Sequence, residues 1–403
     1  MTELVKIGIV FVITLVLTLK RVALWISLLV ASFLIGILFR MPIETILVDL
    51  GRGALDSETL LLVGGLFAIL LFSNLLKQTG RMNEILQGLR SIFKDVRIVI
   101  AILPAMIGLM PIMGGALVSA PMVVDGSDEL KLSPERRTFI NYWFRHVWEY
   151  IMPTYPAFIV ASSLIGIPAG RFARLNFPLT LAAILSGIYV GFWGVSRSSR
   201  SGDGMNVVTY RRLTENLFPL VVSLILVIAF KVELIIAFGL TILGMIFLYG
   251  IDKRSIVKSL KESSSLGLLL AVVVIMGFKK VLESSQAPMG ISTFLSSSGV
   301  PLWMIAILIP LLMGFITGTT IGPMGIGFPI LIPLFQHDPN FLNYMVLAFA
   351  SGVTGDLLSP FHLCLILTKD YFGADLRGVY RLVWFPVICI LSVGVLTTFL
   401  LDG

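Results

Sequence analysis

The chain has 403 residues, of which 57% are hydrophobic and 13% are charged, and it carries a formal charge of +7. Its mean hydropathy is +0.98. Soluble domains carry about 25% charged residues, so this composition excludes a soluble globular protein and predicts an all-α polytopic membrane protein. The positive charge does not indicate a nucleic-acid partner, because Lys and Arg collect in the cytoplasmic loops of membrane proteins.

Apolar runs recur along the whole length. The first run lacks a small-residue cleavage site and leads into another run, so we interpret it as a retained span and not as a signal peptide. The runs cover residues 4–19, 22–39, 59–77, 98–124, 138–167, 172–196, 215–230, 232–250, 264–283, 303–334, 341–367 and 378–400. Two of them, 98–124 and 303–334, are interrupted by Gly and Pro, and each is about long enough for two half-crossings.

Two further runs are predicted to break near the centre. Pro153 and Pro156 interrupt 138–167, and Pro360 interrupts 341–367, because proline removes a backbone donor. One carboxylate precedes each break: Glu149 in the first run and Asp356 in the second. Carboxylates inside a membrane are costly, and they indicate an ion or proton pathway.

Short segments of the two halves resemble each other at a nearly constant spacing. "AILPAMIGL" at 101–109 resembles "LIPLLMGF" at 308–315, and this match pairs Gly108 with Gly314 at an offset of 206 residues. "EYIMP" matches "DLLSP" at an offset of 207, which pairs Glu149 with Asp356. These matches predict a duplication, with a first repeat in 1–200 and a second in 213–403.

Loop charges predict that the two repeats are inverted. Segments 77–97, 197–212 and 251–261 are rich in Lys and Arg and should be cytoplasmic, whereas 284–300 is uncharged and 41–58 is net acidic. The runs 59–77 and 264–283 would then cross in opposite directions. The number of crossings agrees with these loop positions if the chain has ten spans plus two re-entrant hairpins, at 98–124 and 303–334. Both termini would then be outside.

The interrupted hairpins are the predicted solute site. Non-helical backbone at membrane depth persists only where protein, water or a ligand supplies hydrogen-bond partners, and such breaks in inverted repeats mark the central site of transporters. The predicted substrate-binding residues are Gly114, Gly115, Ser119, Tyr155, Thr317, Gly318, Thr319, Thr320 and Ser359. The alternative is that the small residues only let helices pack closely.

The predicted ion-coupling residues surround the two breaks. They are Arg145, His146, Glu149, Thr354, Gly355, Asp356 and His362. Arg145 and Glu149 are four apart and could instead form a structural ion pair, and each histidine could be a hydrogen-bonded packing residue. Cys364 and Cys389 show no metal-ligand spacing, so we expect no cofactor and no metal other than a possible Na+.

The segments "PIMGGALVSAPMV", "NYWFRHVWEYIMPTYPAF", "GFITGTTIGPMGIGFPILIPL" and "LAFASGVTGDLLSPFH" resemble the ion transporter superfamily, which includes divalent anion/sodium symporters and gluconate permeases. A prokaryotic membrane family of unknown function within it is the most similar. The resemblance implies an elevator-type symporter for a small anion in the prokaryotic inner membrane, usually a homodimer, with a scaffold formed by 4–77 and 215–283. The first hairpin tip departs from the Ser-Asn-Thr pattern of the sodium/dicarboxylate members.

Other functions remain open at this point. A flippase for lipid carriers or lipid-linked precursors could use the same scaffold. An intramembrane enzyme is disfavoured because H-E-x-x-H, Gly-x-Gly-Asp and G-x-S-x-G motifs are missing from the sequence. A passive channel is disfavoured because hairpins that enter from opposite faces suit alternating access.

Overall fold

The computed structural model describes residues 3–20, 22–110, 115–198, 207–285 and 299–400, and these ranges are almost entirely helical. The first half contains α1 (Glu3–Leu19), α2 (Leu24–Leu38), α3 (Ile43–Leu55), α4 (Ser57–Gln78), α5 (Arg81–Ile92), α6 (Val96–Gly108), α7 (Gly115–Glu129), α8 (Pro134–His146), α9 (Pro156–Ile165) and α10 (Ala169–Phe192). The second half contains α11 (Val207–Ile228), α12 (Leu234–Tyr249), α13 (Lys253–Ser263), α14 (Leu266–Ser284), α16 (Leu302–Thr317), a π-helical turn (Pro323–Gly327), α17 (Phe328–Phe335), α18 (Phe341–Leu358), α19 (Leu363–Phe372) and α20 (Leu376–Leu400).

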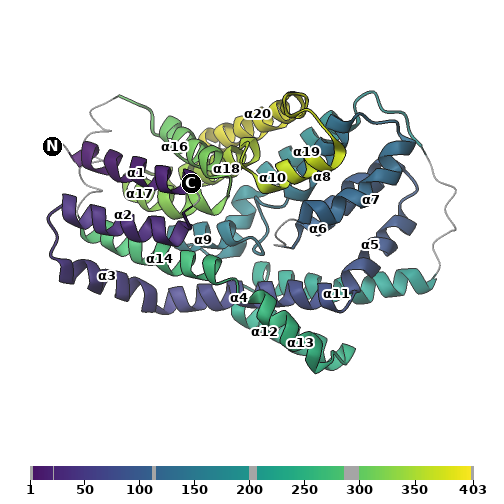
Figure 1. Cartoon of the computed structure of the whole chain (residues 1–403), viewed down its shortest axis with the longest axis horizontal. Coiled ribbons are helices and arrows are strands. Elements are labelled where there is room, and N and C mark those ends of the chain that lie inside the picture. Colours follow the sequence, from purple (N-terminus) through teal and green to yellow (C-terminus); the bar gives the residue numbers. More distant parts are fainter. Residues whose placement is uncertain (1–2, 21, 111–114, 199–206, 286–298, 401–403) are drawn as a thin grey trace.

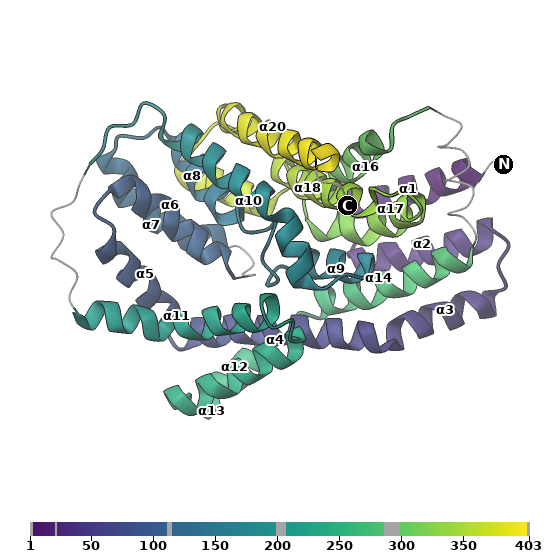
Figure 2. The same cartoon turned by 180° about the vertical axis from the view of Figure 1, so that it is seen from behind.

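The helices form two adjoining groups (Figures 1 and 2). In one group, α14 packs against α2 and α3, and α4 packs against α12 and α13. In the other group, α8 packs against α6, α7 and α19, while α20 packs against α10 and α18. The first group contains the segments predicted as a scaffold, and the second contains the predicted hairpins and broken spans.

Four regions of the described chain are long and apolar enough to cross a membrane: Ser57–Gln78, Ala169–Phe192, Phe341–Phe372 and Leu376–Leu400. The pair α13 and α14, bent by 48°, adds a fifth if it is counted as one span. Other apolar helices, such as α2, α12 and α16, have 10–17 residues. The helices therefore support a multi-pass membrane protein, and the count of ten spans stays a prediction.

Two of the charged segments predicted to be cytoplasmic contain helices: α5 lies within 77–97, and α13 covers most of 251–261. α5 buries Met82, Ile85, Leu86 and Leu89, which recur every three or four residues and so lie on one face of the helix. α13 begins at an N-cap, Asp252, whose side chain accepts a hydrogen bond from Ser255 N at 3.0 Å. Lys and Arg on the exposed faces of these helices obscure their helical pattern in the sequence.

The two breaks lie where proline predicted them. α8 ends at His146 and α9 begins at Pro156, and the chain between them forms turns. α18 ends at Leu358 and α19 begins at Leu363, so Pro360 lies inside the second break. Most residues of the two breaks are buried.

Helix starts recur at one spacing along the chain. Each of three helices in the first half begins 207 residues before a helix in the second half. The pairs of first residues are Pro134 and Phe341, Pro156 and Leu363, and Ala169 and Leu376. The spacing equals the offset that pairs Glu149 with Asp356 in the sequence.

Candidate functional site

The two breaks bring together a histidine from each half of the chain. His146 is the last residue of α8, and His362 is the N-cap of α19. Their ring centroids lie 4.9 Å apart at an interplanar angle of 85°, and both side chains are buried. Tyr142 packs against both rings, and its hydroxyl donates a hydrogen bond to Leu357 O at 3.0 Å. This contact ties α8 to the end of α18.

Asp356 pairs with His362 across the second break. The two side chains are joined by a 2.7 Å contact between Asp356 Oδ1 and His362 Nδ1. Ser359 shapes the turn between them, because its hydroxyl accepts a hydrogen bond from Phe361 N at 3.1 Å. Ser359, a predicted substrate ligand, is buried and has this local bond.

Glu149 lies in the first break beside His146. Its Oε1 is 4.0 Å from His146 Nε2, and the whole side chain is only 6% exposed. His146 Nδ1 lies 2.6 Å from Tyr142 O, and Arg145 Nη1 lies 3.2 Å from His146 Nε2. The first break thus holds a buried carboxylate, an imidazole and a guanidinium.

The first hairpin rests against Arg145. α6 and α7 lie side by side (Figure 1). A Cβ on Gly108 would lie 2.0 Å from Arg145 O, and a Cβ on Gly115 would lie 2.8 Å from Arg145 Nη2. Only glycine fits at Gly108, which faces backbone, whereas at Gly115 the Arg145 side chain would have to shift. Tyr155 donates its hydroxyl hydrogen to Gly108 O, so this predicted substrate ligand joins the hairpin to the break.

The second hairpin makes the equivalent approach to α18. A Cβ on Gly314 would lie 2.2 Å from Gly352 O, and one on Gly355 would lie 2.1 Å from Leu311 O. Gly318, with a φ of +61°, faces Phe361, whose carbonyl carbon would lie 2.8 Å from a Cβ there. The tip of this hairpin therefore touches the second break next to His362.

Several predicted residues donate hydrogen bonds to backbone carbonyl groups nearby in the chain. Thr354 donates to Ala350 O, Ser119 donates to Gly115 O and Ala116 O, and Thr317 donates to Thr319 O. Thr319 is exposed, Thr320 is half-buried, and Gly355 serves the close packing of α16 on α18. Gly114 lies outside the described residues.

Sequence reasoning missed Cys364 and Tyr142. Cys364 lies two residues after His362 on the first turn of α19, and its Sγ, a nitrogen of His146 and a nitrogen of His362 all lie within 4.8 Å of one another. The signal in the second half was the His-x-Cys spacing. His146 lies in the other half of the chain, so no local motif could reveal the third member.

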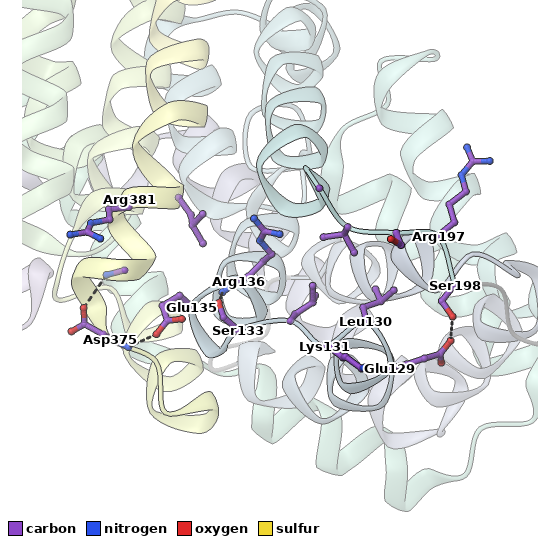
Figure 3. A pocket seen from close by; sticks show the side chains of 16 residues that line it. Glu129, Leu130, Lys131, Ser133, Glu135, Arg136, Arg197, Ser198, Asp375 and Arg381 are labelled. Carbon is purple, nitrogen blue, oxygen red and sulfur yellow. Dashed lines mark hydrogen bonds between the residues drawn. The ribbon is translucent and has the colours of Figure 1, made fainter.

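A cavity in the described chain lies elsewhere, at a cluster of loops near the first turns of α8 and α20 (Figure 3). It has a volume of about 930 Å³ and is lined by side chains of both charges. Asp375 N donates to Glu135 Oε1 at 3.4 Å. Hydrogen bonds from its own backbone amide and from Ser133 hold the pKa of Glu135 below its usual range. This cavity is separate from the residues predicted to bind solute.

The comparisons with known proteins concern both family and fold. The family described as "Protein of unknown function (DUF401)" matches residues 3–401. No functionally curated protein matches the chain in sequence. The chain is similar to the crystal structure of the Alcanivorax borkumensis YdaH transporter, with a TM-score of 0.59 and 13% identity over 89% of this chain and 88% of that chain. At this identity the likeness shows that the two share a fold.

Proposed function

Because the chain belongs to the DUF401 family and shares its fold with a membrane transporter, we propose that it is a secondary active transporter. In this proposal it moves a small organic anion across the membrane by an elevator motion coupled to Na+ or H+. The unit that moves comprises α6–α10 and α16–α20, and the scaffold comprises α1–α4 and α11–α14.

The observation that carries the proposal is the pair of buried carboxylates at the two helix breaks. Asp356 and Glu149 are 2% and 6% exposed, and each lies beside a histidine. Ionised carboxylates at membrane depth are costly unless a cation, a proton or a hydrogen-bond donor neutralises them. A site that must be neutralised to be stable can bind and release a coupling ion.

The hairpins supply the link between ion and solute. Gly115 lies against the Arg145 guanidinium, and Gly318 lies against Phe361, which precedes His362. An anion that enters between the tips would meet the positive charge of Arg145 on one side and the Asp356–His362 pair on the other. The matching contacts at Gly108 and Gly314 support the proposal that the two halves are copies of one unit.

A thermal-shift screen of the purified protein tests the proposal. The ligands are mono-, di- and tricarboxylates, each measured with and without Na+ and at two pH values. A ligand that binds only the folded state raises Tm, so we expect an anion and the coupling ion to stabilise more together than separately. If an anion raised Tm equally with and without Na+ and at both pH values, coupling would be contradicted. If no anion changed Tm, the proposed solute class would be contradicted.

A further inference from the structure

Three potential metal ligands converge where the two breaks cross. His146, His362 and Cys364 each offer one ligand atom, and these atoms lie within 4.8 Å of one another. Their residues are 1%, 6% and 8% exposed. We propose that this crossing binds one transition-metal ion of the Zn²⁺ class through the two imidazoles and the Cys364 thiolate. The inference does not depend on which solute the protein carries.

The Nδ1 contacts of both imidazoles leave Nε2 as the nitrogen that could bind a metal, and at His146 the metal would replace the Arg145 Nη1 donor that lies 3.2 Å from Nε2. Metal-binding histidines usually donate their other ring N–H to a carboxylate or a backbone carbonyl. His362 Nδ1 lies 2.7 Å from the Asp356 carboxylate, and His146 Nδ1 lies 2.6 Å from Tyr142 O. If both Nδ1 atoms donate in these bonds, both Nε2 atoms carry a lone pair. Asp356 and Tyr142 would then orient the two ligands.

Glu149 supplies an oxygen for a fourth position. Its Oε1 lies 4.0 Å from His146 Nε2, and its Oε2 is buried with no hydrogen-bond partner among the described residues. An unpartnered carboxylate oxygen in a buried site carries a large desolvation cost, which coordination to a cation would remove. Two imidazoles, one thiolate and one carboxylate are all established ligands of tetrahedral Zn²⁺.

The local charges balance when a divalent ion is present. Arg145 contributes one positive charge, whereas Glu149 and Asp356 contribute two negative charges. Binding converts the Cys364 thiol to a metal-bound thiolate and releases its proton to solvent, which adds one negative charge against the two positive charges of the metal. The cluster then sums to zero.

The ligand set selects the class of metal. Thiolate and imidazole favour Zn²⁺ and other soft or intermediate transition ions, whereas Mg²⁺, Ca²⁺ and Na+ prefer oxygen ligands. Along the sequence, neither cysteine shows metal-ligand spacing. The spacing is invisible along the chain because α8 and α19 belong to different halves.

Cobalt titration of the purified full-length protein tests the site. After treatment with a chelator, Co²⁺ is added and the thiolate-to-cobalt charge-transfer band in the near ultraviolet is followed. We expect one equivalent of Co²⁺ and a clear band in the wild type, reversed by Zn²⁺ but not by Mg²⁺. The band should vanish in Cys364→Ser and persist in Cys389→Ser, the matched control in α20.

A second variant guards against effects on folding. Asp356→Asn keeps all the ligands, so it should keep the band but bind Co²⁺ about 10–100-fold more weakly, as expected for a residue that orients a ligand. Metal-free size-exclusion profiles show whether each variant is intact. Absence of a band in the wild type, or an equal band in Cys364→Ser, would overturn the inference. Transport need not be measured, so this result is separate from the test of the proposed function.

Discussion

The Asp356 carboxylate lies 2.7 Å from His362 Nδ1, and the break between α18 and α19 separates the two residues in the chain. Gly318 at the tip of the second hairpin packs against Phe361, the residue directly before this histidine. A displacement of the hairpin tip would therefore shift the backbone next to the Asp356–His362 pair. In the proposed transporter, this contact is how occupation of the solute site would change the affinity for the coupling ion.

Glycine at the two equivalent helix contacts should be essential for stability. Gly108→Ala and Gly314→Ala would each place a methyl group about 2 Å from a backbone carbonyl, so the helices must separate, at a cost of about 1–3 kcal/mol or more. Gly239→Ala in α12 is the control, because a Cβ there meets nothing within 4 Å. It should be neutral or raise stability by up to about 1 kcal/mol. Melting curves of the three purified variants check this, and equal Tm values for all three would contradict the packing argument.

The predicted inversion of the two halves can be checked by labelling from one side. Single cysteines replace two exposed residues, Glu58 at the start of α4 and Lys258 in α13 before α14, in a background without Cys364 and Cys389. An impermeant maleimide added to intact cells should label Glu58→Cys, whereas Lys258→Cys should react only after permeabilisation. Labelling of both positions from the same side would contradict inverted repeats.

Asp95 should stabilise the start of the first hairpin in a pH-dependent way. The side chain caps α6 and forms an ion pair with Arg97, and this hydrogen bond lowers the pKa of the Asp95 carboxyl. A lowered folded-state pKa contributes stability above the unfolded value of about 4 and loses it as the pH falls through the folded value. Asp95→Asn should therefore lower Tm at pH 7 by an amount that shrinks below about pH 4. A pH-independent difference in Tm would contradict this assignment.

The Tyr155 hydroxyl should stabilise the contact between the first hairpin and the first break. Its hydroxyl donates to Gly108 O, so Tyr155→Phe leaves that buried carbonyl without this donor and should cost about 1 kcal/mol of stability. Tyr371→Phe, on the exposed surface of α19, is the matched control. Chemical or thermal denaturation should separate the two variants, and indistinguishable curves would show that the bond is not stabilising.

The sequence predicted the helix breaks because proline and glycine act locally. Pro156 begins α9, and Pro360 lies inside the second break. Both positions suit proline, because it has no backbone N–H to donate within a helix. It also predicted that Glu149 and Asp356 lie beside the breaks. The amphipathic helices α5 and α13 were missed because their charged faces resemble cytoplasmic loops, and the four apolar residues of α5 contact neighbours that sequence alone does not reveal.

The arrangement of the site could be anticipated only in part. Gly355 and Thr354 stay predicted ion ligands, and the structure adds that Gly355 packs on Leu311 and that Thr354 donates a hydrogen bond within its own helix. Both roles depend on how α16 lies on α18. The meeting of His146 with Cys364 likewise depends on the crossing of α8 and α19, which no spacing along the chain encodes.

The most direct test of the account compares two aspartate variants in proteoliposomes. Asp356→Asn removes the charge at the second break, whereas Asp370→Asn removes an exposed charge on α19 that pairs with Lys369. Charge movement is recorded on a solid-supported membrane as the carboxylate panel is applied with Na+ and with a pH gradient. We predict currents in the wild type and in Asp370→Asn, and their loss in intact Asp356→Asn. Undiminished ion-driven current in Asp356→Asn would contradict the coupling role of the buried carboxylate.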